Sequence, residues 1–304
     1  MQKNNKATQF KSIANGLADL YEKKNSDYGD SFGRSYEKYG SISSLTRISD
    51  KFNRLESLML GKEQKVQDEK VEDTLADMAS YCIMTIMEMK KRIDRAQIIA
   101  FPGGFSAGDE PDGSGKFIAT AFRNPALSDS VKELLIRDGL VLGICNGFQA
   151  IIKLGLLPYG KIAEQQADSA TLTFNNIARH VSSICKIRIA SNNSPWLSSF
   201  KAGEIYGVPV SHGEGKFICS DKDLQRLIDN GQIATQYVDA SGNATMEYPH
   251  NPNGSRYGIE GIVSEDGRIF GKMGHSERWQ RGLYQNVEAD YDMDIFLNGV
   301  KYFS

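Results

Sequence analysis

The chain has 304 residues, of which 40% are hydrophobic and 24% are charged, and its formal net charge at pH 7 is −2. This composition is typical of globular proteins, and the near-neutral charge gives no electrostatic reason to expect nucleic acid or an anionic membrane as a partner. No apolar run approaches the ~20 residues that span a bilayer, and the length allows about two domains.

The amino-terminal part of the sequence is predicted to be helical. Apolar residues recur at helical spacing in three segments, residues 7–23, 41–60 and 69–93. Turn-forming residues at 25–30 are expected to end the first helix, and Ser43 or Ser44 is available to cap the second. In this interpretation residues 1–95 form an all-α domain of the small-bundle type.

Acidic side chains are frequent on the second and third predicted helices: Asp50, Glu56, Glu72, Asp73 and Asp77. Asp73 and Asp77 are four residues apart and share a helix face, so the cluster is a candidate site for a divalent cation. A solvated acidic face without a metal is an equally good interpretation, and the spacing alone does not decide between them.

The helical region also resembles a known family. The likeness covers about residues 8–92 and is carried by residues 24–30, 47–56 and 72–77. These segments resemble a phage-associated helical domain linked with nucleotide modification, which is itself distantly similar to the all-helical nucleoside triphosphate pyrophosphohydrolases. The resemblance implies a nucleotide as a ligand of this domain.

Helical periodicity gives way to an apolar strand near Ala96, and this strand ends in Pro102-Gly103-Gly104. Adjacent glycines at the carboxyl end of a strand can offer backbone N–H groups to a developing oxyanion. Taken alone, the tripeptide is as consistent with an ordinary turn.

A second apolar strand, residues 140–144, leads into Cys145, which lies between Gly143 and Gly147. A helix is predicted to follow over residues 147–154. A residue on a sharp strand-to-helix turn projects its side chain above the sheet edge, and the N-terminus of the helix stabilises a thiolate. Cys145 is therefore a candidate nucleophile, and a buried structural cysteine is the alternative.

Further downstream, helices and strands alternate in the manner of an α/β fold. The predicted elements are helices over 128–136 and 221–230, strands over 185–190 and 204–210, and a strand pair, 258–263 and 269–273, turning at 265–267. No internal repeat interrupts this pattern.

A base for the candidate nucleophile has to come from the four histidines of the chain. His275 is followed two residues later by Glu277, so in a loop both side chains can point the same way and the carboxylate can fix the imidazole tautomer. The alternative is a pair of surface loop residues, because nearness to Cys145 cannot be read from spacing.

Together these segments resemble a second family. The order of residues 102–104, 143–149 and 275–277 is similar to that of the class I (triad) glutamine amidotransferases. More closely, residues 96–304 look like the carboxyl-terminal glutaminase domain of phosphoribosylformylglycinamidine synthase. Three further segments carry that closer likeness: residues 101–109, 211–217 and 248–255.

The resemblance implies glutamine hydrolysis through a glutamyl thioester on Cys145, with His275 as general base and Glu277 orienting it. The positions implied for the oxyanion and for glutamine binding are Gly103, Gly104, Asn146 and Gln149. His212 and Glu214 fall in a loop that in the relatives lies near the active site and the synthase interface, although an ordinary polar turn is the alternative.

One departure from the family pattern surrounds the histidine. The more common form is Met-Pro-His-Pro-Glu-Arg, whereas this chain has Gly274 and Ser276 on the two sides of His275. The histidine, glutamate and arginine of the motif are all present, so the chemistry implied by the resemblance is unchanged.

The expected fold class is α/β, with a class I glutamine amidotransferase-like parallel sheet in residues 96–304 after an all-α domain in residues 1–95. In the family, further strands precede the Pro-Gly-Gly strand, but here helix occupies that part of the chain. We therefore expect a sheet that lacks its first strands and has an apolar edge.

The function implied is glutamine hydrolysis that supplies ammonia for formylglycinamidine ribonucleotide synthesis in purine biosynthesis. The glutaminase needs no cofactor, while ATP and Mg²⁺ belong to a synthase partner that accepts the ammonia. The alternative is a helical nucleotide-binding or nucleotide-modification protein whose truncated amidotransferase part is structural or inactive. The scattered cysteines and the polar start, residues 1–6, lead us to expect a reduced cytoplasmic setting.

Overall fold

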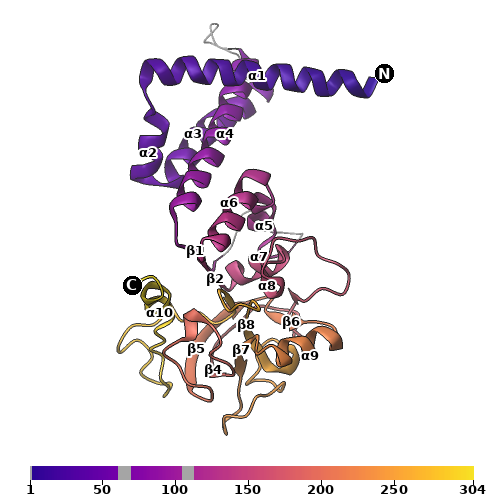
Figure 1. The fold of residues 1–304 in the computed structure, drawn as a ribbon, viewed down its shortest axis with the longest axis vertical. Coiled ribbons are helices and arrows are strands. Elements are labelled where there is room, and N and C mark those ends of the chain that lie inside the picture. Colours follow the sequence, from indigo (N-terminus) through magenta and orange to yellow (C-terminus); the bar gives the residue numbers. More distant parts are fainter. Residues whose placement is uncertain (1, 61–69, 105–112) are drawn as a thin grey trace. The chain divides into compact units, whose positions relative to one another are not determined.

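The computed structural model describes residues 2–60, 70–104 and 113–304. The chain forms two compact units, Met1–Arg92 and Ile93–Ser304, and each is described here by itself (Figure 1). Within the described ranges, no helix combines the length and apolar character that crossing a membrane requires.

The first unit is built from helices. They are α1 (Gln2–Tyr28), α2 (Ser31–Tyr39), α3 (Ser41–Met59) and α4 (Val71–Arg95). The three predicted helices are present, but the turn predicted over residues 25–30 is wrong for its first part, because α1 continues to Tyr28. The helix ends only where Gly29 adopts a positive φ of 61°, a conformation that glycine enters without strain.

Helix α2 was not predicted. It begins at Ser31, so only two residues separate it from the end of α1 at Tyr28. The carboxylate of Asp30 accepts a hydrogen bond from the N–H of Gly33 at 2.9 Å, which satisfies a free donor of the new helix. Neither Ser43 nor Ser44 caps α3, whose N-cap is Gly40. The Ser43 hydroxyl instead donates back to the Gly40 carbonyl at 2.8 Å.

The second unit alternates strands and helices. Its helices are α5 (Lys116–Phe122), α6 (Pro125–Ile136), α7 (Asn146–Lys153), α8 (Leu156–Tyr159), α9 (Asp221–Asp229) and α10 (Ile295–Lys301). Its strands are β1 (Ile98–Phe101), β2 (Leu140–Ile144), β3 (Thr171–Thr173), β4 (Val181–Ile189), β5 (Ile205–His212), β6 (Lys216–Ile218), β7 (Ile233–Tyr237), β8 (Ile259–Val263) and β9 (Ile269–Lys272). Single 3₁₀ turns occur at Pro195–Leu197 and Arg256–Gly258.

Seven strands form one sheet in the order β1-β2-β9-β8-β7-β4-β5, and β3 pairs with β6 separately. β1, β2 and β9 are parallel, whereas each remaining neighbour in the large sheet is antiparallel. The fold class expected from the sequence is confirmed, with a parallel part that begins at β1. No strand in the described residues pairs with the outer edge of β1, so the sheet is short on that side, as predicted.

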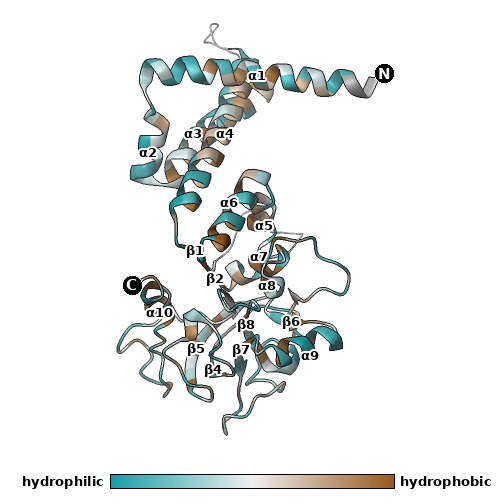
Figure 2. Cartoon of the chain, in the orientation of Figure 1, coloured by the Kyte–Doolittle hydropathy of each residue, from teal (hydrophilic) through white to brown (hydrophobic). Residues whose placement is uncertain are grey.

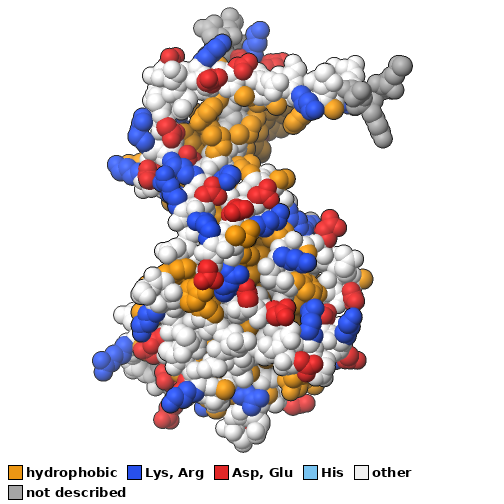
Figure 3. Space-filling model, in the orientation of Figure 1, with side chains coloured by type: hydrophobic (Ala, Val, Ile, Leu, Met, Phe, Trp, Pro, Cys, Tyr) orange, Lys and Arg blue, Asp and Glu red, His pale blue; other side chains and the backbone are white. Residues whose placement is uncertain are grey.

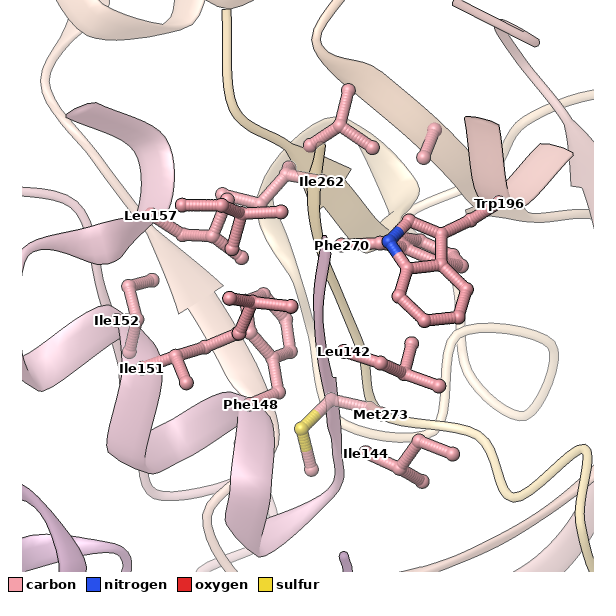
Figure 4. Packing of buried hydrophobic residues seen from close by; sticks show 14 of the residues in the cluster. Leu142, Ile144, Phe148, Ile151, Ile152, Leu157, Trp196, Ile262, Phe270 and Met273 are labelled. Atoms are coloured by element: carbon pink, nitrogen blue, oxygen red, sulfur yellow. The ribbon is translucent and has the colours of Figure 1, made fainter. Parts of the chain in front are cut away.

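Both faces of the central strands are covered by apolar side chains. Figure 4 shows Phe148 and Ile151 of α7 on one side of the strands, with Leu142 and Trp196 on the other. All four are at most 1% exposed. Burial of this kind stabilises by roughly 1.5–3 kcal/mol for each large side chain, so the end of β2 that carries Cys145 is held in a rigid core.

Candidate active site

Cys145 stands at the turn between β2 and α7, where the sequence predicted a strand-to-helix bend. Its backbone has φ 52° and ψ −108°, a region that residues with a Cβ rarely occupy. The N–H of Cys145 donates to the Lys272 carbonyl at 2.8 Å, which ties the bend to β9. A side chain on Gly147 would collide with the Phe101 carbonyl, so the close packing of α7 on β1 requires glycine there.

The thiol of Cys145 is buried, with 5% of the residue exposed. Burial raises the pKa of Cys145 to about 11, because desolvation disfavours the thiolate. The backbone N–H groups of Asn146 and Gly104 and the charge of Arg278 act in the opposite direction, since each favours negative charge at the sulfur. Two of these groups, at Gly104 and Asn146, are the oxyanion positions implied by the family motif.

His275 is fully buried on the segment that follows β9. Its Nδ1 lies 2.6 Å from Oε1 of Glu277, and its backbone N–H donates to the Pro209 carbonyl at 2.8 Å. Within the described residues, Nε2 has no hydrogen-bond partner. The ring is thus oriented by the hydrogen bond at Nδ1, while Nε2 is buried and has no partner among the described residues.

Cys145 and His275 both lie close to Gly103. A Cβ at Gly103 would lie 3.2 Å from the Cβ of Cys145 and 3.2 Å from Nδ1 of His275. The same position is only 2.5 Å from Cε1 of His275, so any side chain there would displace the ring. Cys145 and His275 therefore both border the position that a side chain of residue 103 would take, and glycine leaves that position empty.

Glu277 is ionised under ordinary conditions. Burial acts to raise the pKa of its carboxyl, but the hydrogen bond and charge of His275, a backbone hydrogen bond and the charge of Lys272 outweigh burial and lower the pKa overall. A carboxylate in this position can hold the imidazole in one tautomer and stabilise its protonated form.

A pocket with a volume of about 420 Å³ opens beside the thiol. Its lining includes Gly104, Ser114, Cys145, Gln149, Phe174, Arg179, His180, His212, Glu214 and Arg278. Gln149 donates from Nε2 to the Glu214 carbonyl at 2.6 Å, and Oε2 of Glu214 accepts the N–H of Ser114 at 3.1 Å. The pocket has room for a small amino acid, and two arginines supply positive charge along its wall.

His212 lies in the same wall and is 3% exposed. Its two ring nitrogens have no hydrogen-bond partner among the residues that the structure describes. Burial lowers the pKa of His212 to about 4, so its imidazole is neutral near pH 7. A neutral, buried ring is consistent with a packing role and also with a contact to a ligand in the pocket.

A set of buried amides holds this wall in place. Asn175 accepts the N–H of Gly215 at 3.0 Å, and Asn253 donates to the Gly215 carbonyl at 2.8 Å. Ser255 accepts the N–H of Phe217 at 3.0 Å. Asn253 and Ser255 belong to the predicted motif 248–255, whereas Asn175 was not predicted, because a single asparagine in a loop carries no pattern.

Not every predicted position lies where the structure can be described. Residues 105–109 of the motif 101–109 are outside the described residues. Arg278 follows directly from the His-Ser-Glu-Arg motif, whereas Arg179 and Ser114 were missed because only the fold brings them to the pocket.

The acidic residues of the helical unit do not assemble into a metal site in the described part of the chain, where no group of three or more potential ligands occurs. Asp77 lies 2.8 Å from the Lys51 ammonium and 3.6 Å from that of Lys24. Asp73 accepts the N–H of Lys70 at 2.9 Å at the start of α4. Asp50, Glu56 and Glu72 are exposed.

Two families match the sequence. Residues 68–303 match the family described as the CobB/CobQ-like glutamine amidotransferase domain. Residues 24–89 match the family described as nucleotide modification associated domain 1. These matches confirm both of the resemblances that the motifs indicated.

Curated relatives and a solved structure agree with the first match. Phosphoribosylformylglycinamidine synthase subunit PurQ of Methanococcus maripaludis (strain C7) is 38% identical over 240 residues, which are 71% of this chain and 84% of the relative. The subunit of the same name from Dehalococcoides mccartyi is 35% identical over 229 residues, covering 72% and 85%. The structure of PurLQS from Thermotoga maritima is 25% identical, with a TM-score of 0.51 over 69% of this chain and 82% of the other.

Proposed function

Since this chain belongs to the CobB/CobQ-like glutamine amidotransferase family, we propose that it hydrolyses glutamine through Cys145, His275 and Glu277. The ammonia released serves formylglycinamidine ribonucleotide synthesis in purine biosynthesis. The curated relatives, named as synthase subunits, support this role.

In the first half of the proposed reaction, the Cys145 sulfur attacks the carboxamide carbon of glutamine. Because burial raises the pKa of this thiol to about 11, the thiol is protonated at neutral pH and needs a base. His275 takes the proton at Nε2, the buried ring nitrogen that has no hydrogen-bond partner among the described residues. The N–H groups of Gly104 and Asn146 stabilise the oxyanion of the tetrahedral intermediate.

Collapse of that intermediate breaks the carbon–nitrogen bond. His275 returns the proton to the departing amine, so ammonia leaves and a glutamyl thioester remains on Cys145. In the second half, His275 deprotonates a water molecule that attacks the thioester carbonyl. The carbon–sulfur bond breaks, glutamate is released, and the Cys145 sulfur takes the proton back from His275. Glu277 holds the imidazole through Nδ1 in both halves.

One observation carries this proposal. Nδ1 of His275 and the Cβ of Cys145 lie at the same distance, 3.2 Å, from one point above Gly103, although 130 positions of sequence separate the two residues. The hydrogen bond from His275 to Glu277, the two backbone N–H groups and the adjoining pocket support the same proposal, because acyl transfer needs an oriented base, oxyanion donors and a substrate pocket.

A synthase partner is the proposed acceptor of the ammonia. The glutaminase itself needs no cofactor, and ATP and Mg²⁺ would act in the partner. The expectation that both His212 and Glu214 lie in a loop is wrong for His212, which ends β5, and Glu214 follows in the loop. Both line the pocket, and this segment is the part we expect to respond to that partner.

The test is to incubate the purified chain with glutamine and to measure glutamate release by wild type and Cys145→Ala. We expect release by wild type and a loss of at least about 10³-fold in the variant, because among the described residues that line the pocket Cys145 is the cysteine. Cys219→Ala is the matched control, since Cys219 is a partly exposed cysteine of the same unit that does not line the pocket.

A second measurement reads out the same sulfur without turnover. A diazoketone analogue of glutamine is expected to alkylate Cys145, as located by peptide mass spectrometry, and to leave Cys219 unmodified. Equal glutamate release by wild type and Cys145→Ala would reject the proposed nucleophile.

A nucleotide-binding role for the helical unit is the second candidate. It is supported by the match of residues 24–89 to a nucleotide modification associated domain. A cavity of about 510 Å³ in this unit is lined by the rings of Phe32, Tyr39 and Tyr81, with Arg47 at its wall. Aromatic rings can stack on a base, and a guanidinium can pair with phosphate.

Calorimetric titration with nucleoside triphosphates distinguishes the two candidates. If the helical unit binds nucleotide, binding is unchanged in Cys145→Ala and is weakened about tenfold or more by Arg47→Ala. Binding of equal strength in Arg47→Ala, or none in wild type, would contradict this second role.

A further inference from the structure

Two opposite charges are completely buried beside the site, and the proposed reaction gives neither a role. Glu260 lies on β8 and Lys272 at the end of β9, on adjacent antiparallel strands. Their side chains are 0% exposed, and Nζ of Lys272 lies 3.3 Å from Oε1 of Glu260. Taking two charges out of water is costly, so such a pair persists only when further hydrogen bonds satisfy its remaining atoms.

Those further bonds converge on the segment that carries His275. The N–H of Gly274 donates to Oε1 of Glu260 at 2.5 Å. Nζ of Lys272 donates to the Gly274 carbonyl at 2.7 Å and to the Ser276 hydroxyl at 3.1 Å. The pair therefore hydrogen-bonds to the residues on both sides of His275. Two of these bonds are to the main chain of Gly274, and one is to the side chain of Ser276.

The same lysine also contacts the opposite side of the site. Its carbonyl accepts the N–H of Cys145 at 2.8 Å. Lys272 therefore contacts both the backbone of Cys145 and the segment that carries His275. On its far side, the Glu260 carboxylate accepts the hydroxyl of Thr235 from β7, which anchors it in the middle of the sheet.

We propose that Glu260 and Lys272 are positioning residues that set the place and orientation of the His275 imidazole relative to Cys145. This inference rests on the proposed glutaminase function. The ring is fully buried and fixed to Glu277 at only one nitrogen, so its direction depends on the backbone of residues 274–276. The buried pair holds this segment at three points, the N–H and carbonyl of Gly274 and the hydroxyl of Ser276.

The residues at 274 and 276 fit this role. A Cβ at Gly274 would lie 2.9 Å from Oε1 of Glu260 and 2.7 Å from Cγ2 of Val208, so the carboxylate occupies space that a side chain would need. A proline at 274 would lack the N–H that Glu260 accepts. The glycine and serine that replace the prolines of the common motif are thus the residues that the pair contacts.

The test compares steady-state glutamate release by several variants of the full chain. Removing one partner leaves a buried charge unpaired and is expected to destabilise the fold strongly. The informative variant is therefore the double variant Glu260→Gln/Lys272→Met, which is neutral, keeps an acceptor for the Gly274 N–H and fills the lysine's volume. We expect kcat to fall about 10²-fold while KM changes less than about threefold, because misplacement of a reacting group by about 1 Å has an effect of this size.

Ile262→Val is the matched control. Ile262 is a fully buried residue of β8 in the same core, and it makes no contact of the kind described with residues 274–276. It is expected to lower the melting temperature while leaving kcat unchanged, which separates positioning from general destabilisation. The single variant Ser276→Ala removes the contact between Lys272 and the Ser276 hydroxyl, which is one of the three, and should give a smaller fall in kcat than the double variant.

The outcomes separate this inference from the function on which it rests. If wild type and Cys145→Ala release glutamate equally, the proposed function fails and the inference fails with it. If these two differ but the folded double variant keeps the kcat of wild type, only the positioning role is overturned. A fall in kcat that Ile262→Val reproduces would also overturn it.

Discussion

The two units of this chain differ in how completely they bury their apolar side chains. In the α/β unit, a continuous core covers both faces of the sheet. In the described part of the helical unit, Tyr36 and Leu55 are the apolar side chains that are buried. Large apolar side chains remain exposed on each of its helices: Phe10, Ile13, Leu20 and Tyr28 on α1, Tyr39 on α2, Ile42, Leu45, Phe52 and Met59 on α3, and Leu75, Ile83 and Met87 on α4.

This difference teaches that an apolar stripe predicts a helix but not the presence of a core. Figure 2 shows hydrophobic and hydrophilic residues alternating along the helices of the first unit, and Figure 3 shows hydrophobic side chains on the surface beside α1. Acyl transfer requires groups fixed to within a fraction of an ångström. The unit with the closed core is the one in which Cys145 and His275 both lie close to Gly103.

The sharpest test of where the chemistry resides is His275→Gln. We expect kcat for glutamate release to fall about 10²–10⁴-fold, because glutamine cannot exchange a proton with the thiol and the leaving group. His250→Gln is the control, since His250 is exposed on another loop of the same unit. Comparable losses in both variants would contradict a specific role for His275.

The next largest effect compares the two kinds of packing. Leu142 on β2 is 1% exposed, and Leu142→Ala is expected to destabilise the α/β unit by about 2–5 kcal/mol. Phe52 on α3 is 54% exposed, and Phe52→Ala is expected to change stability by no more than about 0.5 kcal/mol.

Urea unfolding can follow the units separately. Both tryptophans of the chain, Trp196 and Trp279, are in the α/β unit, so their fluorescence reports that unit, whereas far-ultraviolet circular dichroism reports the helices of both. We expect dichroism to change at lower urea than fluorescence. Coincident transitions, or a Phe52→Ala effect as large as that of Leu142→Ala, would contradict the comparison.

Much of the fold could be predicted from periodicity, and what could not has identifiable causes. The predicted strand over 140–144 matches β2, and the predicted pair 258–263 and 269–273 is the β8–β9 hairpin. β7 was missed because its sequence, Ile-Ala-Thr-Gln-Tyr, mixes polar residues into a strand that is buried throughout. Helix α2 was missed because glycine and aspartate at 29 and 30 indicate a turn, and only the cap shows that a helix starts there.

The residues of the site were predictable by type but not by contact. The motifs nominated Cys145, His275 and Glu277, yet no spacing could show that two of them would lie close to Gly103. Glu260 and Lys272 were not nominated at all, because charged residues in strands are ordinarily on a solvent-facing side. Both residues are buried because both faces of the sheet are covered, and their hydrogen bonds to Gly274 depend on how the strands pair, which the sequence alone does not show.

The pH dependence of thiol alkylation sharpens the comparison at the level of single cysteines. Because burial raises the pKa of Cys145 to about 11, its thiolate fraction should grow about tenfold for each pH unit between about 7 and 9. The rate of labelling by iodoacetamide at Cys145, followed by peptide mass spectrometry, is expected to rise in that proportion. Exposed Cys82 on α4 is the internal reference for reagent and access. A rate at Cys145 that is independent of pH would indicate a preformed thiolate and contradict attack by a neutral thiol.

The smallest expected effect concerns the ion pairs of Asp77, which contribute to the stability of a helical unit that has few buried apolar side chains. Burial acts to raise the pKa of Asp77, but the hydrogen bond and charge of Lys51 and the charge of Lys24 lower it overall below 3.8. A carboxyl with a lowered pKa in the folded state stabilises above its ordinary pKa, and this contribution is lost as the pH falls through the folded value. Asp77→Asn should therefore lower the stability of the helical phase by less than about 1 kcal/mol at pH 7, because the pair is partly exposed, and by less still near about pH 3.

The measurement is the urea midpoint of the dichroism phase for wild type and Asp77→Asn at both pH values, with the tryptophan phase as the control. Added salt should reduce the difference at pH 7, since a partly exposed pair is screened. An effect of Asp77→Asn that is as large at low pH as at pH 7 would mean that packing, and not charge, is lost in the variant. The helical unit would then depend on a core contact at Asp77 that the exposed apolar stripes do not indicate.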